Sequence, residues 1–391
     1  VNLKIHQYGY ALGGFGNGVY IAFITVIFPL IAPAYFSTAT SGLLLTSATF
    51  AAGVSPLLIG PLTDRIAVGF GRRKVFILFG TLAATFFLLA QGSLHSAIPI
   101  GVVFLTAGLF RSLTVAPHMA LLLSNAGPKQ RSLLAAFTTV MTLGGQVVLT
   151  GIALVLWKQT IPASAFWVIA LLFSLPWVVS SFTSRDNPGI KSTDWNLKRD
   201  VLIFVKDRER AFYMAGQLSL WFGINGVVAY FILFLRQRLG VSQTESIWLY
   251  LLIVLGSGIF SYPFVILGRV IGEVRAFKIG LAFFAVVSLL GILAVGLPHI
   301  LLYVLAFSAG IGNAATAVYA FPLFTRLFSE KDSGLGSGLH VFISSGIAPI
   351  AAVVTGFFIR RTGFESMFVV LFIAVVVSLL FLNQVHFQDA N

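Results

Sequence analysis

The chain has 391 residues, of which 58% are hydrophobic and only 9% are charged, and its mean hydropathy is +0.97. A composition this apolar excludes a soluble globular domain and predicts an integral membrane protein. The sequence contains no cysteine, which excludes disulfides, thiolate metal sites and cysteine nucleophiles.

Apolar runs of about 20 residues recur along the whole chain, the length that crosses the hydrocarbon core of a bilayer as a helix. A membrane barrel would show alternating segments of about 10 residues instead. The sequence therefore predicts an all-α integral membrane fold with twelve transmembrane helices. We expect these spans at residues 8–36, 40–63, 75–94, 97–124, 133–156, 162–183, 210–238, 244–267, 276–296, 299–325, 334–359 and 362–385.

The net charge of +13 is distributed unevenly between the loops. Most of the 25 basic residues lie near the N-terminus or in loops that follow even-numbered spans. By the positive-inside rule, both termini are then cytoplasmic, and we expect a bacterial inner (cytoplasmic) membrane protein. The basic loops face anionic lipid headgroups, so nucleic acid is not an expected partner.

The longest polar stretch, residues 184–209, is predicted to be a cytoplasmic linker between six-helix bundles at 1–183 and 210–391. Two pairs of similar segments relate the two halves of the chain. FGNGVY at 15–20 matches FGINGVV at 222–228, which aligns Asn17 with Asn225, and GLFRSLT at 108–114 matches GIGNAAT at 310–316, which aligns Arg111 with Asn313. Their shared order indicates the internal repeat of an alternating-access transporter.

The connection after the second span, GPLTDRIAVGFGRRK, concentrates charge and glycine. Glycine lets backbones approach closely, and a carboxylate at a helix end can accept hydrogen bonds from arginine or lie against the positive N-terminus of a neighbouring helix. We therefore predict a cytoplasmic gate at Gly60, Asp64, Arg65, Gly71 and Arg72. The alternative is that these charges only fix the topology.

This loop resembles the Gly-x-x-x-Asp-Arg, Gly-Arg-Arg motif between spans two and three of major facilitator superfamily transporters. The five residues between Arg65 and Gly71, and the segment 116–132, are similar to the sucrose-transporter and glycoside-pentoside-hexuronide:cation symporter branch. The resemblance implies two six-helix bundles that move a small organic solute by alternating access. This chain lacks the residues that couple transport to a cation in that branch. At the corresponding positions it has Met119, Ser124, Ala51 and Ser55.

None of the twelve acidic residues falls in the middle of a predicted span. Proton and sodium coupling usually need a buried titratable or anionic group, so we expect uncoupled or exchange-type transport. His118 and His340 are the only titratable exceptions.

Arg111 lies near the centre of the fourth span, where burial of a charge is costly unless the side chain faces a polar cavity. An anionic solute would satisfy it, and the alternative is a structural role with helix carbonyls, Asn313 or Gln146 as partners. His118, seven residues further on, shares its helix face and is either a second ligand or a packing residue. The predicted substrate-binding residues are Arg111, Asn17, Asn225, Asn313, Gln146 and His118.

The expected solute is a sugar, a sugar acid or another organic anion. No phosphate loop, nucleophile triad or acid pair is present in the sequence, so neither an enzyme nor a cofactor or metal is expected. The alternative function is a non-transporting assembly or pigment-delivery factor, as in the related bacteriochlorophyll-delivery branch, with a photosynthetic membrane complex as its partner. Efflux of amphiphiles is disfavoured because residues 142–151 lack the Gly-Pro pairing typical of drug antiporters.

Overall fold

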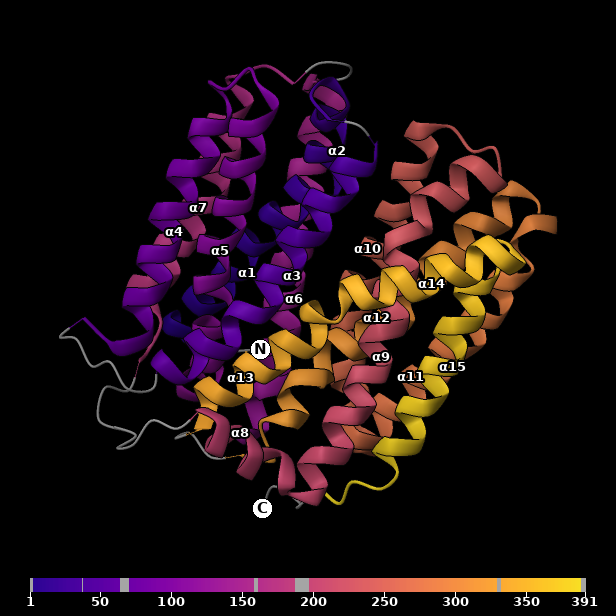
Figure 1. The fold of residues 1–391 in the computed structure, drawn as a ribbon. Helices are drawn as coiled ribbons and strands as arrows, with labels where there is room; N and C mark the ends of the chain where they lie inside the picture. The colour runs from indigo at the N-terminus through magenta and orange to yellow at the C-terminus, as the bar shows by residue number, and fades with distance from the viewer. Residues whose placement is uncertain are drawn as a thin grey trace. The chain divides into compact units, whose positions relative to one another are not determined.

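The computed structural model describes residues 3–36, 38–63, 70–157, 161–186, 197–328 and 332–387, and these residues form helices and their connections (Figure 1). Ten of the described helices are long and apolar enough to cross a membrane. Two shorter apolar helices, Ser47–Thr63 and Ser366–Leu382, complete the twelve predicted spans. The prediction of an all-α, twelve-helix membrane fold is confirmed.

The chain separates into two compact units. Unit 1 comprises Val1–Leu197 and Phe328–Phe342, and unit 2 comprises Lys198–Leu327 and Ile343–Asn391. The helices of unit 1 are α1 (Ile5–Ala22), α2 (Phe28–Ile31), α3 (Thr38–Thr63), α4 (Arg72–Gln91), α5 (Ala97–Asn125), α6 (Arg131–Ile152), α7 (Ala165–Thr183) and α13 (Ser333–Val341). Those of unit 2 are α9 (Arg208–Leu233), α10 (Gln243–Ile271), α11 (Glu273–Ile292), α12 (His299–Phe324), α14 (Ala348–Thr362) and α15 (Ser366–Leu382), preceded by α8 (Leu197–Lys206).

The two units use the same packing scheme. In unit 1, α1 packs against α6 and α7, and α5 packs against α3 and α4. In unit 2, α9 packs against α14 and α15, and α12 packs against α10 and α11. Equivalent helices of the two units therefore make equivalent contacts, as the internal repeat in the sequence predicts.

Glycines make the close helix approaches in both units. A Cβ on Gly18 of α1 would lie 2.7 Å from the carbonyl carbon of Thr142 on α6, and one on Gly223 of α9 would lie 2.7 Å from Cβ of Ala374 on α15. Any larger side chain would force these helices apart, because the obstructing atoms belong to, or lie next to, a backbone. The glycine pattern around Asn17 and Asn225 therefore sets how deeply α1 and α9 are packed.

The eleventh predicted span, 334–359, is not one regular helix. It consists of α13, a π-helical segment at Phe342–Gly346, and α14, and its first part belongs to unit 1 while the remainder belongs to unit 2. Pro349 explains the interruption, because proline has no N–H for the carbonyl four residues earlier and its ring clashes with that carbonyl.

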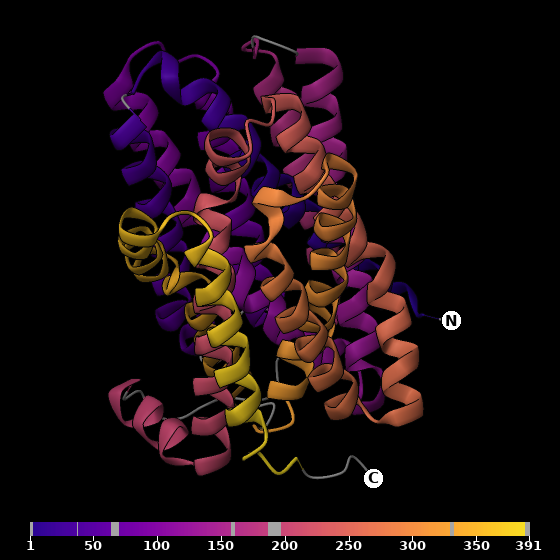
Figure 2. The ribbon, with the colours of Figure 1, turned by 90° about the vertical axis from the view of Figure 1, so that its right-hand side faces the viewer.

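The predicted linker 184–209 contains a helix, α8, which Figure 2 shows lying across the direction of the long helices of unit 2. Phe204 of α8 is 2% exposed and packs edge-on to Phe324 of α12, with ring centroids 5.9 Å apart. The guanidinium of Arg210 covers the Phe204 ring at 4.6 Å. Part of the linker is thus packed, whereas the division into bundles at 183 and 210 stays a prediction.

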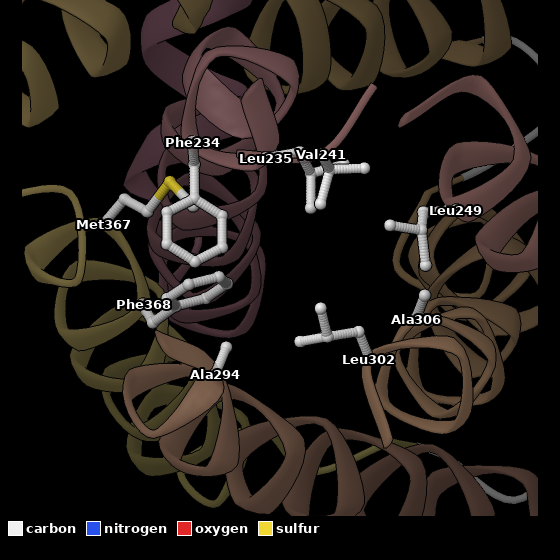
Figure 3. Packing of buried hydrophobic residues seen from close by; sticks show 9 residues of the cluster. All are labelled: Phe234, Leu235, Val241, Leu249, Ala294, Leu302, Ala306, Met367 and Phe368. Atoms are coloured by element: carbon white, nitrogen blue, oxygen red, sulfur yellow. The ribbon is translucent and has the colours of Figure 1, made fainter. Parts of the chain in front are cut away.

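An apolar cluster lies at one end of the helices of unit 2 (Figure 3). The rings of Phe234 and Phe368 meet edge to face, with centroids 5.3 Å apart, and Met367 lies beside them. The cluster joins the end of α9 to the beginnings of α10, α12 and α15, which ties these helix ends together.

Candidate functional site

Arg111 on α5 is held by two neutral groups of α1. Its Nη2 donates a hydrogen bond to Oδ1 of Asn17, and its guanidinium lies 5.2 Å from the centre of the Tyr20 ring. The Nε atom of Arg111 has no hydrogen-bond partner within the described ranges. No described carboxylate forms an ion pair with this guanidinium, so none of the described acids neutralises its charge.

The position of Asn17 follows from its glycine neighbours. Gly16 faces α7, where a Cβ would lie 2.6 Å from the carbonyl oxygen of Phe173, and Gly18 faces α6. With these two faces of α1 in close contact, the intervening Asn17 is directed to α5, where Arg111 meets it. The sequence left Asn313 and Gln146 open as partners of Arg111, and the structure gives Asn17 instead.

Tyr20 adds a second unsatisfied polar atom next to Arg111. Its side chain is 3% exposed, and its hydroxyl has no hydrogen-bond partner in the part of the chain that the structure describes. The same hydroxyl would lie 3.1 Å from a Cβ on Gly108, one helical turn before Arg111 on α5. A buried hydroxyl without a partner costs about 1–3 kcal/mol, so this arrangement favours a bound group that can accept from it.

His118 also contacts α1, but it is enclosed by packing. Its Nε2 lies 2.8 Å from the carbonyl oxygen of Tyr10, and its ring stacks on the Tyr10 ring with centroids 4.3 Å apart. The rings of His118 and Trp177 are perpendicular to each other, with centroids 4.9 Å apart. His118 is therefore on the Arg111 side of α5, in an environment that supplies its ring with contacts from the protein alone.

The remaining predicted ligands lie on other helices. Gln146 is buried in α6 at 6% exposure. Asn225 on α9 donates both Nδ2 hydrogens, to the carbonyl oxygens of Trp221 and Ser344, each at 2.8 Å. Asn313 on α12 donates to Oγ of Ser257 on α10 at 2.8 Å. The structure brings Asn17 to Arg111, and it does not bring Gln146 or His118 into hydrogen-bond contact with that guanidinium.

The predicted gate is described only in part, because Asp64 and Arg65 lie outside the described residues. Gly71 directly precedes α4 and has φ of 120°, a conformation that favours glycine, and Gly272 directly precedes α11 with φ of 90°. Directly after Gly71, the side chain of Arg72 is 1% exposed and that of Arg73 is buried completely. The charged side chains of Arg72 and Arg73 are thus buried in the protein at the start of α4.

An acid that the sequence analysis did not single out serves the N-terminus of α4. Oδ2 of Asp186, just after α7, accepts from the backbone N–H of Arg73 at 2.7 Å and from that of Lys74 at 3.4 Å. A carboxylate here satisfies amides that the helix leaves open and opposes the positive end of its dipole. The only sequence signal was its place, three residues after the end of the predicted span 162–183.

Helix α13 packs on this region within unit 1. The Nη2 of Arg73 donates to Oγ of Ser333, the first residue of α13, and all nine residues of α13 are buried. A Cβ on Gly60 of α3 would lie 2.9 Å from the carbonyl carbon of Gly334, and it would lie even closer to the carbonyl oxygen of Gly334. Two backbones are therefore in direct contact, with Arg73 at one end of the contact.

Comparisons with known proteins agree with this architecture. The family model of the Major Facilitator Superfamily matches residues 10–242 and 213–389. No curated protein matches the sequence. A bacterial homologue of the iron transporter ferroportin, solved in an outward-facing state, is similar with a TM-score of 0.76 and 16% identity over 98% of this chain and 99% of that chain.

The human organic anion transporter MFSD10 (TETRAN) is similar to the same degree, with a TM-score of 0.76 and 14% identity over 97% of this chain and 98% of that chain. At such identities the likeness to solved structures shows the fold alone. The match of the family model covers nearly the whole chain, and it agrees with the apolar helices and the repeated packing of the two units. The chain is an integral membrane protein and belongs to the Major Facilitator Superfamily of secondary transporters.

Proposed function

We propose that this protein transports a small organic anion by alternating access, with Arg111 as the ligand of the anionic group. The observation that carries the proposal is the guanidinium of Arg111, which meets an amide oxygen and an aromatic ring but no carboxylate among the described residues. Arg111 is partly buried near the middle of its helix, and a cation at that depth without a counter-charge is costly in a membrane. A carboxylate or phosphate on the solute supplies the missing charge.

The geometry leaves donors for such a group. Arginine has five N–H donors, and the bond to Asn17 uses one of them. This bond and the Tyr20 ring fix the plane of the guanidinium, so that its other N–H groups are oriented before the solute arrives. Planar, two-point recognition of a carboxylate is what a fixed guanidinium provides and an ammonium group does not.

In unit 2 we assign Asn225 to the solute and Asn313 to helix packing. Both Nδ2 hydrogens of Asn225 are used by the protein, so its Oδ1 is the atom that would accept from a solute hydroxyl. Asn313 joins α12 to α10 through Ser257, whose hydroxyl donates in turn to the carbonyl oxygen of Gly310 at 3.0 Å.

Alternating access involves the eleventh span directly, because that span begins in unit 1 and ends in unit 2. Any motion between the units must either detach α13 from α3 and α5 or bend the chain at Phe342–Gly346. The π-helical geometry of this segment and the following Pro349 make it a natural hinge. We propose both termini to be cytoplasmic, which places α13 and the Gly71 turn on the cytoplasmic side.

The test is a thermal-shift screen of purified protein with matched pairs of solutes, such as gluconate with glucose, and lactate with lactamide. We expect the anion of at least one pair to bind, and Arg111→Gln to weaken that binding about 10- to 100-fold, since a hydrogen bond to a charged group contributes about 1.5–3 kcal/mol. Arg111→Lys keeps the charge but loses the planar fork, so it should have an intermediate effect.

A matched control is Arg361→Gln, because the guanidinium of Arg361 also covers a ring, that of Phe357 at 4.3 Å, but is exposed. This variant should bind the anion as the wild type does. Equal losses of neutral and anionic ligands in Arg111→Gln would show a structural role for Arg111. Copurification of a coloured pigment or a photosynthetic complex, with no solute bound, would favour the assembly-factor alternative instead.

A further inference from the structure

The helix α8 lies at the level where long helices of unit 2 begin and end. Phe204 of α8 contacts Phe324, the last residue of α12, and α9 begins at Arg208, two residues after α8 ends. Figure 2 shows α8 lying across the direction of these helices and extending sideways from the start of α9. Because α9 and α12 are long and apolar enough to cross a membrane, α8 lies close to the plane of the lipid headgroups.

The packing of Phe204 determines which side of α8 points away from unit 2. Leu202 and Lys206 lie two residues before and two residues after Phe204, or about 200° around the helix, so both are on the opposite side. Leu202 is 49% exposed, Val205 beside it is 39% exposed, and Lys206 is exposed as well. Lys198 precedes Leu202 by four residues, a spacing that continues the same row along the helix. The side of α8 that points away from unit 2 is therefore a row of one leucine between two lysines, here called the outer row (Lys198, Leu202 and Lys206).

The acids that follow the outer row in the sequence make contacts within the protein. Oδ1 of Asp207 accepts from the backbone N–H of Arg210 at 2.9 Å, and Oε2 of Glu209 accepts from the backbone N–H of His386 at 2.6 Å. No acid in the described part of the chain forms an ion pair with Lys206. The ammonium group of Lys206 is therefore available to an anionic partner outside the protein.

The surface of an anionic membrane matches the chemistry of the outer row. A helix that lies in the headgroup plane inserts apolar side chains toward the acyl chains, while lysine side chains extend so that their ammonium groups stay among the phosphates. Each lysine or arginine near an anionic surface strengthens the attraction by a factor of about five. The depth of α8, its direction and the composition of its outer row all fit this partner.

We propose that the outer row of α8 docks on anionic phospholipids of the cytoplasmic leaflet. Leu202 and Val205 insert among the headgroups, and Lys206 binds a lipid phosphate. The choice of leaflet follows from the proposed cytoplasmic termini, whereas the docking does not depend on the solute that is transported. Docked in this way, α8 supports the start of α9 from the membrane surface.

The test uses one fluorescent label, which is simple to place because the sequence contains no cysteine. In Leu202→Cys the thiol carries the apolar fluorophore NBD, which takes the place of the leucine and is quenched by nitroxide-labelled lipids only where it lies in the membrane. The full chain is placed in nanodiscs of phosphatidylcholine, either alone or with about 30% of the anionic lipid phosphatidylglycerol. We expect quenching in the anionic nanodiscs and a ratio of docked to free α8 that is at least fivefold lower in the neutral ones. Lys206→Gln should lower this ratio about fivefold in the anionic nanodiscs.

The matched control is Arg236→Gln, because Arg236 is exposed at the opposite end of α9 and its loss should leave the ratio unchanged. Hydrogen exchange of the unlabelled protein provides a second readout. Amides of α8 should exchange more slowly in anionic than in neutral nanodiscs, and Leu202→Gln should reduce this difference. Neither readout uses a solute, so a failure of the proposed transport function would not affect this test.

Three results would overturn the docking of α8 on anionic lipid. The first is a label that the lipid nitroxides quench equally, or not at all, in both kinds of nanodisc. The second is a Lys206→Gln variant that behaves like Arg236→Gln. The third is a label that is shielded from water but not reached by the lipid nitroxides, which would place the outer row against a second protein molecule.

Discussion

The contact between Gly60 of α3 and α13 gives the sharpest structural prediction. In Gly60→Ala, the new Cβ would lie 2.9 Å from the carbonyl carbon of Gly334 and 3.3 Å from Cα of Gly338. Both obstructing atoms belong to a backbone, so no side chain can rotate away and α13 must shift by about 0.5 Å or more to restore ordinary contact distances. Overpacking of this kind costs about 1–3 kcal/mol, which lowers the free energy that holds α13 on α3.

Hydrogen exchange followed by mass spectrometry measures this loss locally. A cost of 1–3 kcal/mol corresponds to about 5- to 150-fold faster exchange of the amides in α13, if they exchange by detaching from α3. Alanine is a better helix former than glycine, so exchange of α3 itself should become slower. Opposite changes in two helices distinguish a local detachment from a general loss of stability.

The matched control is Gly151→Ala in α6, where a new Cβ meets nothing within 4 Å. This variant should leave the exchange of α13 as it is in the wild type. If Gly60→Ala is folded and α13 exchanges at the wild-type rate, the backbone contact between Gly60 and Gly334 does not hold α13, and the argument for a gate at this point fails.

Three further predictions concern other parts of the molecule. Asp186→Ala removes the acceptor at the start of α4 and should lower the free energy of unfolding by about 0.5–2 kcal/mol, measured by denaturation in detergent, whereas an unchanged stability would contradict the capping role. Burial alone would raise the pKa of Glu365, but hydrogen bonds from its own backbone N–H and from Arg238 (2.8 Å) lower it below the ordinary value. The stabilisation that ionised Glu365 provides is therefore complete above its unfolded-state pKa and is lost as the pH falls through its folded-state pKa. Glu365→Gln should lower the free energy of unfolding by about 0.2–1 kcal/mol near pH 7 and leave it unchanged in strong acid. A loss of stability that does not depend on pH would contradict the ion pair. Liposomes with an imposed sodium or pH gradient should not accumulate the solute, because the sequence has no acidic residue in the middle of a predicted span. Gradient-driven accumulation that survives replacement of both His118 and His340 would refute this.

The fold was largely predictable because its main determinant is local. A helix long and apolar enough to cross a bilayer is visible in any window of about 20 residues, and all twelve expected spans have a counterpart. The glycine patterns around Asn17 and Asn225 also made the internal repeat recognisable in the sequence, because glycine occurs where helices approach most closely.

The partners of individual side chains were much less predictable. Whether Arg111 meets Asn17, Gln146 or Asn313 depends on the rotation of each helix about its axis, which is set by contacts between segments far apart in the sequence. Asp186 was overlooked for the same reason, since its position at the start of α4 results from the packing of α7 against that helix. The gate prediction rested on Asp64 and Arg65, which lie outside the described residues, while Gly60 and Gly71 do occupy positions that require glycine.

The central claim is that Arg111 binds the anionic group of the transported solute. The most direct measurement is counterflow in proteoliposomes, in which a radiolabelled anion identified by the solute screen exchanges against the same unlabelled anion inside. The account predicts rapid exchange of the anion by the wild type, none of its neutral analogue, and loss of exchange in Arg111→Gln, with Arg361→Gln retaining it. Exchange of the anion at the wild-type rate by a folded Arg111→Gln protein, or equal exchange of the neutral analogue by the wild type, would contradict it.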